Sequence, residues 1–110
     1  MESPTELLQG TLDLLILKVL SLGPRHGWDI SQRINEISEQ LLTVNQGSLY
    51  PALHRLEGRG FVDAEWTMSA TTARRVRLYK ITARGRQCLT KETQVWRSYS
   101  RAVDLILHTR

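Results

Sequence analysis

Residues 45–60 read NQGSLYPALHRLEGRG, and this stretch indicates the fold of the whole chain. Leu49, Leu53 and Leu56 recur at the spacing of a helix with one buried face. Gly60 follows that pattern directly, and a glycine there can adopt the left-handed conformation that ends many helices. The stretch therefore predicts a helix that packs on a core and stops at Gly60.

Tyr50 and Pro51 stand near the start of this helix, on the side away from its buried face. Proline is tolerated in the first turn of a helix, where backbone N–H groups lack intrahelical acceptors, but it is costly further in. We therefore expect Gly47 or Ser48 to cap the helix, and the helix to start near Ser48 rather than at Asn45.

Two further helices are expected before this stretch. The first covers about residues 5–22 and is apolar on nearly all sides, with Leu14 and Leu17 forming a patch opposite the main stripe. A helix of this kind must be buried all round, and 110 residues offer little material for that. We therefore expect a subunit interface on this patch. The second helix covers residues 27–41, with a core-facing stripe of Ile30, Ile34, Ile37 and Leu41.

After Gly60 the apolar pattern changes to a period of two. Residues 61–66 and 74–81 read as short strands around a polar connection at residues 67–73. Three helices followed by a hairpin predict a mainly α fold with a small β-hairpin, the winged helix-turn-helix. In that fold the third helix enters the major groove of DNA.

The last part of the chain predicts one long helix, capped by Thr82 and running to about His108. Such a helix, roughly 27 residues long, far exceeds the mean helix length and must protrude from a small core. Its apolar stripe is expected to meet a second copy of the chain. We therefore expect a DNA-binding domain over residues 1–81 and a dimerisation helix over residues 82–110. The predicted dimer interface comprises Leu14, Leu17, Leu89, Trp96, Tyr99, Val103 and Ile106.

Charge is distributed unevenly along the chain, whose formal net charge is +4. Residues 1–73 hold five Lys and Arg against nine Asp and Glu, a net charge of −4. Residues 74–110 hold ten against two, a net charge of +8. Such clustering predicts an anionic partner, for which double-stranded DNA is the leading candidate, although a basic face kept for solubility would give the same pattern.

The third helix and the hairpin carry the candidate DNA contacts. Small residues on the helix face opposite the core would let the backbone approach a duplex closely, and wing arginines suit phosphates or a minor groove. Tyr50 could instead pack on the second helix, and His54 could be exposed without a role. Trp28, Trp66 and Trp96 are expected in the core or at an interface. The predicted DNA-binding residues are Gln46, Gly47, Ser48, Tyr50, Pro51, His54, Arg55, Arg74, Arg75 and Arg77.

Other classes of function have little support in the sequence. His26, His54 and His108 show no metal-ligand spacing with one another or with Cys88. The chain has no phosphate-binding glycine loop and no serine nucleophile motif. One cysteine indicates a reducing, cytoplasmic location, and the apolar run at residues 11–22 is too short to cross a bilayer. We expect no enzyme, no cofactor, no metal and no membrane segment.

Four segments resemble the PadR family of transcriptional regulators. They are LLQGTLDLLILKVL (7–20), GPRHGWDI (23–30), GSLYPALHRLEGRGFV (47–62) and LYKITARGRQCL (78–89). Together they cover most of the chain, which resembles the short form with a single C-terminal helix. The resemblance implies a homodimeric repressor that reads an inverted-repeat operator, with its last helix packed on the first helix of the other protomer.

The resemblance also implies a small aromatic or hydrophobic effector, for which Trp96 and Tyr99 at the dimer interface are the candidate residues. Trp28 departs from the family pattern, in which a tyrosine is more usual. The C-terminal region is short, so a large dedicated effector domain is not expected. The alternative function is a winged-helix protein–protein interaction module that does not bind DNA.

Overall fold

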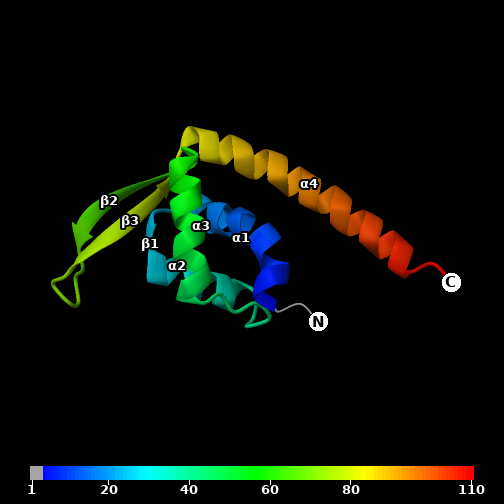
Figure 1. Cartoon of the computed structure of the whole chain (residues 1–110), viewed down its shortest axis with the longest axis horizontal. Helices are drawn as coiled ribbons and strands as arrows, with labels where there is room; N and C mark the ends of the chain where they lie inside the picture. Colours follow the sequence, from blue (N-terminus) through cyan, green and yellow to red (C-terminus); the bar gives the residue numbers. More distant parts are fainter. Residues whose placement is uncertain (1–3) are drawn as a thin grey trace.

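The computed structural model describes residues 4–110, with side chains described from residue 11 onward. Three helices form a small body, a β-hairpin wing extends from one side, and a long helix leaves on the other (Figure 1). This arrangement confirms the predicted winged helix-turn-helix with a long C-terminal helix. The elements in chain order are α1 (Pro4–Ser21), β1 (Arg25–His26), α2 (Gly27–Ile37), α3 (Gln46–Gly58), β2 (Val62–Met68), β3 (Arg75–Ile81) and α4 (Ala83–Leu107).

The core lies between α1, α2 and α3 and is closed on one side by the sheet. Leu49, Leu53 and Leu56 are all buried on the inner face of α3, as the sequence predicts. Leu17 differs from the expectation of an exposed patch, because its side chain is only 1% exposed and packs in the core of its own chain. Leu14 is half-buried. The reason is that α1 contacts α2, α3, β3 and α4 within one chain, so most sides of this apolar helix are covered.

Helix α2 ends at Ile37, four residues earlier than predicted. Ile37 and Leu41 are exposed, so only the first half of the predicted core stripe is correct. Polar side chains near the helix end provide the reason, since they bond to backbone groups that a continuing helix would use. The Leu42 N–H donates to Ser38 Oγ (3.1 Å), and the Val44 N–H donates to Asn35 Oδ1 (3.0 Å).

Helix α3 starts at Gln46, so the predicted start near Ser48 is wrong. Asn45 is the cap, and its Oδ1 accepts the N–H of Ser48 at 2.9 Å. Pro51 consequently lies inside the helix, past the first turn, and deletes the N–H that would have bonded to the Gly47 carbonyl. The strong asparagine cap stabilises the first turn in spite of this loss.

The end of α3 agrees with the prediction. Gly60 adopts a left-handed conformation with φ +78°. Its N–H donates to the Glu57 carbonyl (3.0 Å), and the N–H of Phe61 donates to the Leu56 carbonyl (3.0 Å). This is the Schellman arrangement, in which the last helical carbonyls are satisfied by residues beyond the helix.

The sheet has three antiparallel strands in the order β1-β3-β2. The two wing strands match the predicted hairpin, with no end shifted by more than two residues. Strand β1 was missed, because two residues are too few to show a period. It pairs Arg25 with Tyr79 and His26 with Leu78, and so fixes the start of α2 against the base of the wing.

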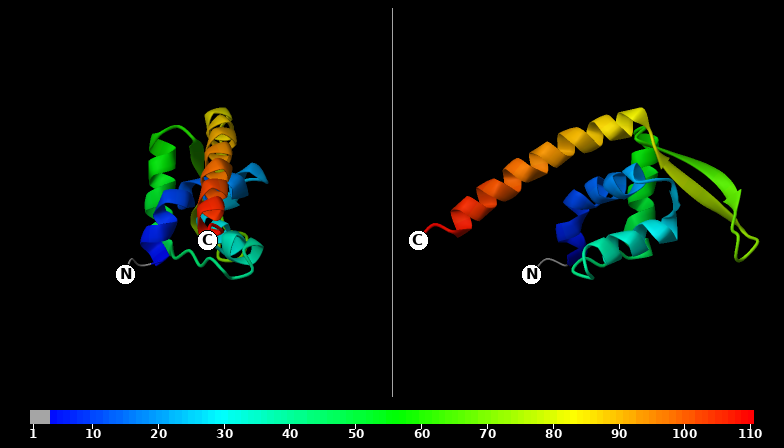
Figure 2. Two further views of the ribbon diagram at one scale, coloured as in Figure 1. Left: turned by 90° about the vertical axis from the view of Figure 1, so that its right-hand side faces the viewer. Right: turned by 180° about the vertical axis from the view of Figure 1, so that it is seen from behind.

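Helix α4 is capped by Thr82, whose Oγ1 accepts the N–H of Gly85 at 3.0 Å, as predicted. Gly85 is the only buried residue of the helix, and a Cβ there would collide with the carbonyl oxygen of Phe61. Beyond this joint α4 leaves the body, and the described residues span 58 Å along the longest axis (Figure 2). Trp96, Tyr99, Val103 and Ile106 are exposed along it, whereas Leu89 packs partly on the core of its own chain.

Candidate nucleic-acid interface

Helix α3 presents an outer face of small and polar residues. Gly47, Pro51, His54 and Gly58 are all exposed and lie opposite the buried leucines. No atom lies near a Cβ placed on Gly58, so this face is open. The outer face can therefore approach another molecule closely along its whole length, with His54 as its hydrogen-bonding side chain.

Tyr50 lies at the edge of this outer face, next to the start of α2. A Cβ added to Gly27 would lie 2.8 Å from both Cε1 and Oη of the Tyr50 ring. The ring thus packs on Gly27, which agrees with the alternative that Tyr50 packs against the second helix. The side chain is nevertheless 45% exposed, so part of the ring remains open to solvent.

Gln46 and Arg55 are engaged within the chain. Gln46 Nε2 donates to Ser31 Oγ at 2.8 Å, and Ser31 is fully buried in α2. Arg55 Nη2 lies 3.1 Å from Asp13 Oδ1, which turns the guanidinium toward α1 rather than toward the outer face of α3. Both side chains therefore fix α3 against its neighbours in this structure.

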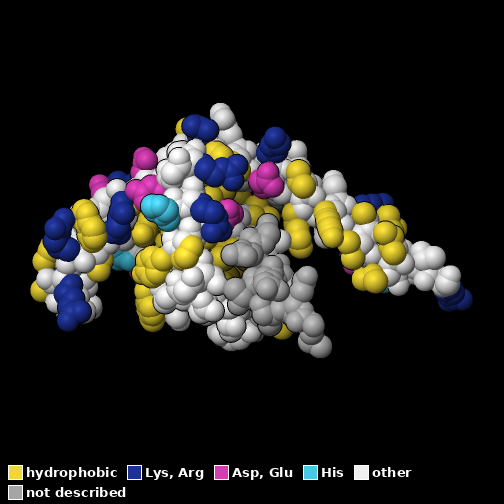
Figure 3. Space-filling view, in the orientation of Figure 1, with side chains coloured by type: hydrophobic (Ala, Val, Ile, Leu, Met, Phe, Trp, Pro, Cys, Tyr) yellow, Lys and Arg dark blue, Asp and Glu magenta, His cyan; other side chains and the backbone are white. Residues whose placement is uncertain are grey.

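The wing carries the predicted arginines, but in three different environments. Arg77 Nη2 lies 2.8 Å from Glu57 Oε2, so one guanidinium joins the wing to α3. Arg75 lies over the ring of Trp66 at 4.8 Å and has no carboxylate within ion-pair distance among the described residues. Arg74 is exposed near the wing tip. Basic side chains gather over the wing and hydrophobic ones along α4 (Figure 3).

The roles of Glu57 and Trp66 were missed in the sequence. Trp66 pairs with Arg77 across the two wing strands and is flanked by Arg75 and Arg77, at 4.8 and 5.5 Å from its ring. The alternation of the hairpin could have indicated that Trp66 and Arg77 face the same side. The ion pair between Glu57 and Arg77 spans a turn and two elements, and no local sequence pattern indicates it.

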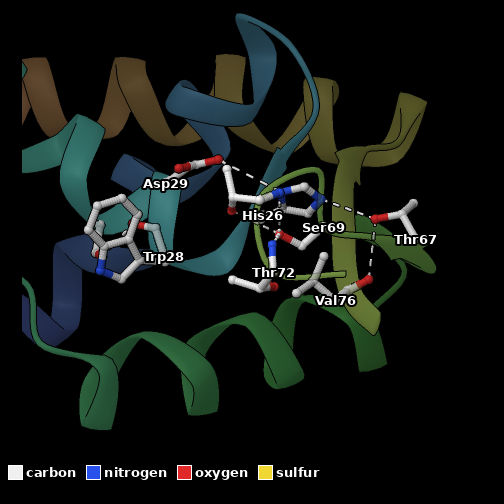
Figure 4. A network of polar contacts seen from close by, with 9 residues as sticks. His26, Trp28, Asp29, Thr67, Ser69, Thr72 and Val76 are labelled. Atoms are coloured by element: carbon white, nitrogen blue, oxygen red, sulfur yellow. Dashed lines mark hydrogen bonds and ion pairs between the residues drawn. The ribbon is translucent and has the colours of Figure 1, made fainter. Parts of the chain in front are cut away.

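A polar network joins the start of α2 to the wing (Figure 4). His26 Nδ1 lies 3.8 Å from Asp29 Oδ2, and His26 Nε2 lies 3.1 Å from Thr67 Oγ1. Thr67 Oγ1 in turn donates to the Val76 carbonyl at 3.3 Å. This network links the N-terminal end of α2 to both strands of the wing. It depends on the unforeseen strand β1, so no local sequence pattern indicates it.

An open groove of about 380 Å³ lies where α2, α3 and the wing meet. We call it the aromatic groove, because Trp28, Tyr50, Trp66 and Tyr79 line it together with Arg75 and Arg77. Trp28 and Trp66 are 61% and 57% exposed, so neither lies in the core of the chain, and their place at an interface stays a prediction. Burial raises the pKa of the Tyr79 phenol above its usual value, although the charge of Arg77 opposes the shift. Tyr79 is therefore neutral at physiological pH.

The side chains of metal-binding type are scattered over the described residues. No group of three or more His, Cys, Asp or Glu side chains in this part of the chain could hold a metal ion. Burial and the Glu92 carboxylate raise the pKa of the Cys88 thiol, which disfavours the reactive thiolate. None of the helices described is long and apolar enough to cross a membrane.

The candidate effector residues lie on the protruding part of α4. The rings of Trp96 and Tyr99 are stacked with centroids 6.3 Å apart and an interplanar angle of 6°. Both side chains are about half exposed in the single chain. They present a flat aromatic surface that α4 carries away from the body.

Comparison with known proteins places this chain in a family. The model of the transcriptional regulator PadR-like family matches residues 16–91 of this chain. The transcriptional regulator Rv3488 of Mycobacterium tuberculosis is 37% identical over 78 residues, which are 71% of this chain and 68% of that protein.

Solved structures agree with this match. A PadR-like transcriptional regulator from Bacillus cereus has a TM-score of 0.79 at 26% identity, over 96% of this chain and 99% of that one. Bacillus subtilis PadR, solved in complex with operator DNA, has a TM-score of 0.67 at 28% identity, over 76% of this chain and 45% of its own. The chain therefore belongs to the PadR-like family of transcriptional regulators.

Proposed function

We propose that this protein is a sequence-specific DNA-binding transcriptional regulator that acts as a dimeric repressor on an inverted-repeat operator. The observation that carries the proposal is the open outer face of α3 beside a basic wing that is fixed to it through Glu57 and Arg77. The operator complex of Bacillus subtilis PadR supports it, since that protein shares the fold.

In this proposal α3 enters the major groove and the wing lies along the neighbouring backbone or minor groove. Gly47, Pro51 and Gly58 allow close approach, and His54 offers a hydrogen bond to a base edge. Arg74 and Arg75 neutralise phosphates. Gln46, Ser48, Tyr50 and Arg55 belong to the same surface, with Gln46 and Arg55 released from their intrachain partners or kept as positioning groups.

The dimer in this proposal is formed by α4. Residues 82–110 act as the dimerisation segment and residues 1–81 as the DNA-binding domain. Trp96, Tyr99, Val103 and Ile106 supply the apolar contacts, Leu14 and Leu89 lie at the edge of the interface, and Leu17 supports it from the core. A two-fold dimer would place two α3 helices on half-sites roughly 10 base pairs, or a multiple of one turn, apart.

The remaining assignments follow from the same function. The protein acts in the cytoplasm, where the DNA that it binds would lie, and the proposal assigns it neither an enzymatic activity nor a cofactor. The proposed effector is a small aromatic or hydrophobic molecule that binds beside Trp96 and Tyr99. Repression occurs by occupation of a promoter.

Footprinting and quantitative binding on the region upstream of its own gene test the proposal. We expect a protected inverted repeat, an affinity at least about 10³-fold above that for random DNA, and a log–log salt slope of about −0.9 per phosphate contacted. Arg75→Ala should weaken binding and reduce the slope by about one. Equal affinity for random DNA would exclude a specific regulator. Absence of any salt-dependent binding would favour the protein–protein module instead.

A further inference from the structure

The aromatic groove is lined by two exposed tryptophans. Trp28 and Trp66 present large apolar surfaces to solvent, at 61% and 57% exposure. Exposed apolar surface of this kind commonly marks an interaction site. The tryptophans come from different elements, α2 and the wing, so their convergence on one groove is a property of the tertiary structure.

The charge of the groove is small and localised. Arg77 is paired with Glu57, and His26 has Asp29 beside it at 3.8 Å. Among the described residues, no carboxylate lies within ion-pair distance of Arg75. Arg75 is therefore the one arginine of the groove lining whose charge is unpaired in this part of the chain. A groove with mainly apolar walls and a single cation at its rim suits a partner in which apolar and singly anionic units alternate.

The position of the groove identifies that partner. It lies between the outer face of α3 and the wing, and both Tyr50 of α3 and Arg75 of the wing line it. In a duplex, the ridge between a major groove and its neighbouring minor groove is a sugar–phosphate strand. That strand alternates deoxyribose rings, whose C–H surfaces are apolar, with phosphates of single negative charge.

We propose that the aromatic groove holds the sugar–phosphate backbone of one DNA strand, with Trp28 and Trp66 packed on deoxyribose and Arg75 facing a phosphate. This inference rests on the proposed function and adds two DNA-contacting residues that carry no charge. The groove is preformed for this role. The guanidinium groups of Arg75 and Arg77 lie on Trp66, Glu57 holds Arg77, and the Tyr50 ring rests on Gly27.

The test compares apolar and charged contacts by their salt dependence. Operator binding is measured for Trp28→Ala, Trp66→Ala and Arg75→Ala over a salt series, with Leu41→Ala as the control. Leu41 is 85% exposed, apolar and outside the groove. We expect each tryptophan variant to bind roughly tenfold more weakly at every salt concentration with an unchanged slope, because no ion pair is lost. Arg75→Ala should reduce the slope by about one, and Leu41→Ala should match the wild type.

Trp66→Phe and Trp28→Phe keep an aromatic surface and should recover most of the affinity, and circular dichroism with thermal unfolding verifies the fold of every variant.

Wild-type affinity in both tryptophan alanine variants would overturn the inference and leave the proposed function intact. A slope reduced by Trp66→Ala as much as by Arg75→Ala would also overturn it, because Trp66 would then act only by holding the arginine. Absence of operator binding by the wild type would overturn both proposals. A small aromatic compound that occupies the groove without competing with operator DNA would overturn this inference alone.

Discussion

The winged helix-turn-helix body and helix α4 differ in how far their apolar side chains are buried within the chain. In the body, apolar side chains such as Leu49, Leu53 and Leu56 are at most 1% exposed, so the core is completed within one chain. On α4, Trp96 and Ile106 remain 47% and 72% exposed, and Gly85 at its start is the only buried residue. The core of the body is completed by its own chain, whereas Trp96, Tyr99 and Ile106 in the outer part of α4 are not covered by any described part of it.

This difference separates two sources of stability. An isolated helix is marginal in water, and most helical stability in proteins comes from packing an apolar face. The body should therefore fold with a stability independent of protein concentration. The outer half of α4 should depend on a second chain, and its stability should rise with concentration.

The largest effect is expected when the surface of α4 is made charged. Trp96→Asp combined with Val103→Asp would bury two unpaired carboxylates in the proposed interface. We expect the dimer dissociation constant to rise by at least about 100-fold, equivalent to roughly 3 kcal/mol, measured by analytical ultracentrifugation.

The matched control acts on the body. Leu53→Ala removes a buried side chain and should cost about 2–5 kcal/mol in the free energy of unfolding, with little change in the dissociation constant of the remaining folded dimer. If the double variant Trp96→Asp, Val103→Asp sediments like the wild type, the exposed surface of α4 does not form the dimer interface.

The joint between the two regions should be the next most sensitive position. In Gly85→Ala the new methyl group would collide with the Phe61 carbonyl, and backbone cannot move aside cheaply. We expect a net loss of about 2 kcal/mol by chemical denaturation, despite the better helix propensity of alanine. Gly58→Ala is the control, because the space around Gly58 is open, and it should be neutral or slightly stabilising. Equal effects at both positions would contradict the proposed close packing at the joint.

Pro51→Ala should have a smaller effect of opposite sign. Alanine restores a backbone donor inside α3 and should stabilise the body by about 1 kcal/mol or more in thermal unfolding. If Pro51 shapes the DNA-facing end of α3, operator affinity should fall while stability rises. A variant that gains stability and keeps full affinity would show that the proline is dispensable for binding.

The smallest effect is expected where the wing meets α3. Glu57→Gln breaks a partly exposed ion pair with Arg77, whose two side chains are 32% and 34% exposed, and should cost less than about 1 kcal/mol, measured by urea denaturation. Arg33→Gln is a suitable control, since it breaks the more exposed pair with Glu36 on α2. A loss above about 2 kcal/mol would mean that the wing is part of the folding core rather than an attachment to it.

Much of the fold could be predicted because its signals are local. The leucine spacing of α3, the left-handed Gly60 and the Thr82 cap each lie within a few residues of the structure that they specify. The wrong predictions share a different cause. Helix α2 ends early because the side chains of Asn35 and Ser38 accept hydrogen bonds from the following loop. Helix α3 starts early because Asn45, rather than Gly47 or Ser48, caps it. Several polar residues could serve in each case, and only the folded geometry selects one.

Single residues of the candidate surface could be proposed from the sequence, but their arrangement could not. The basic wing and the small outer face of α3 follow from composition and period alone. The environments of Arg55, Arg75 and Arg77 do not, because their partners Asp13, Trp66 and Glu57 come from other elements.

The sequence by itself determined the presence of the helices and the hairpin, the asymmetry of charge, the apolar character of the first helix and the apolar stripe of the last. These properties depend on side chains that are close in the chain, where periodicity and capping act. Only the tertiary structure decided that Leu17 is covered within its own chain, that Arg77 is tied to α3, and that Trp28 and Trp66 line one groove. The reason is that burial and ion pairing depend on distances between elements, and helix packing and strand register set those distances.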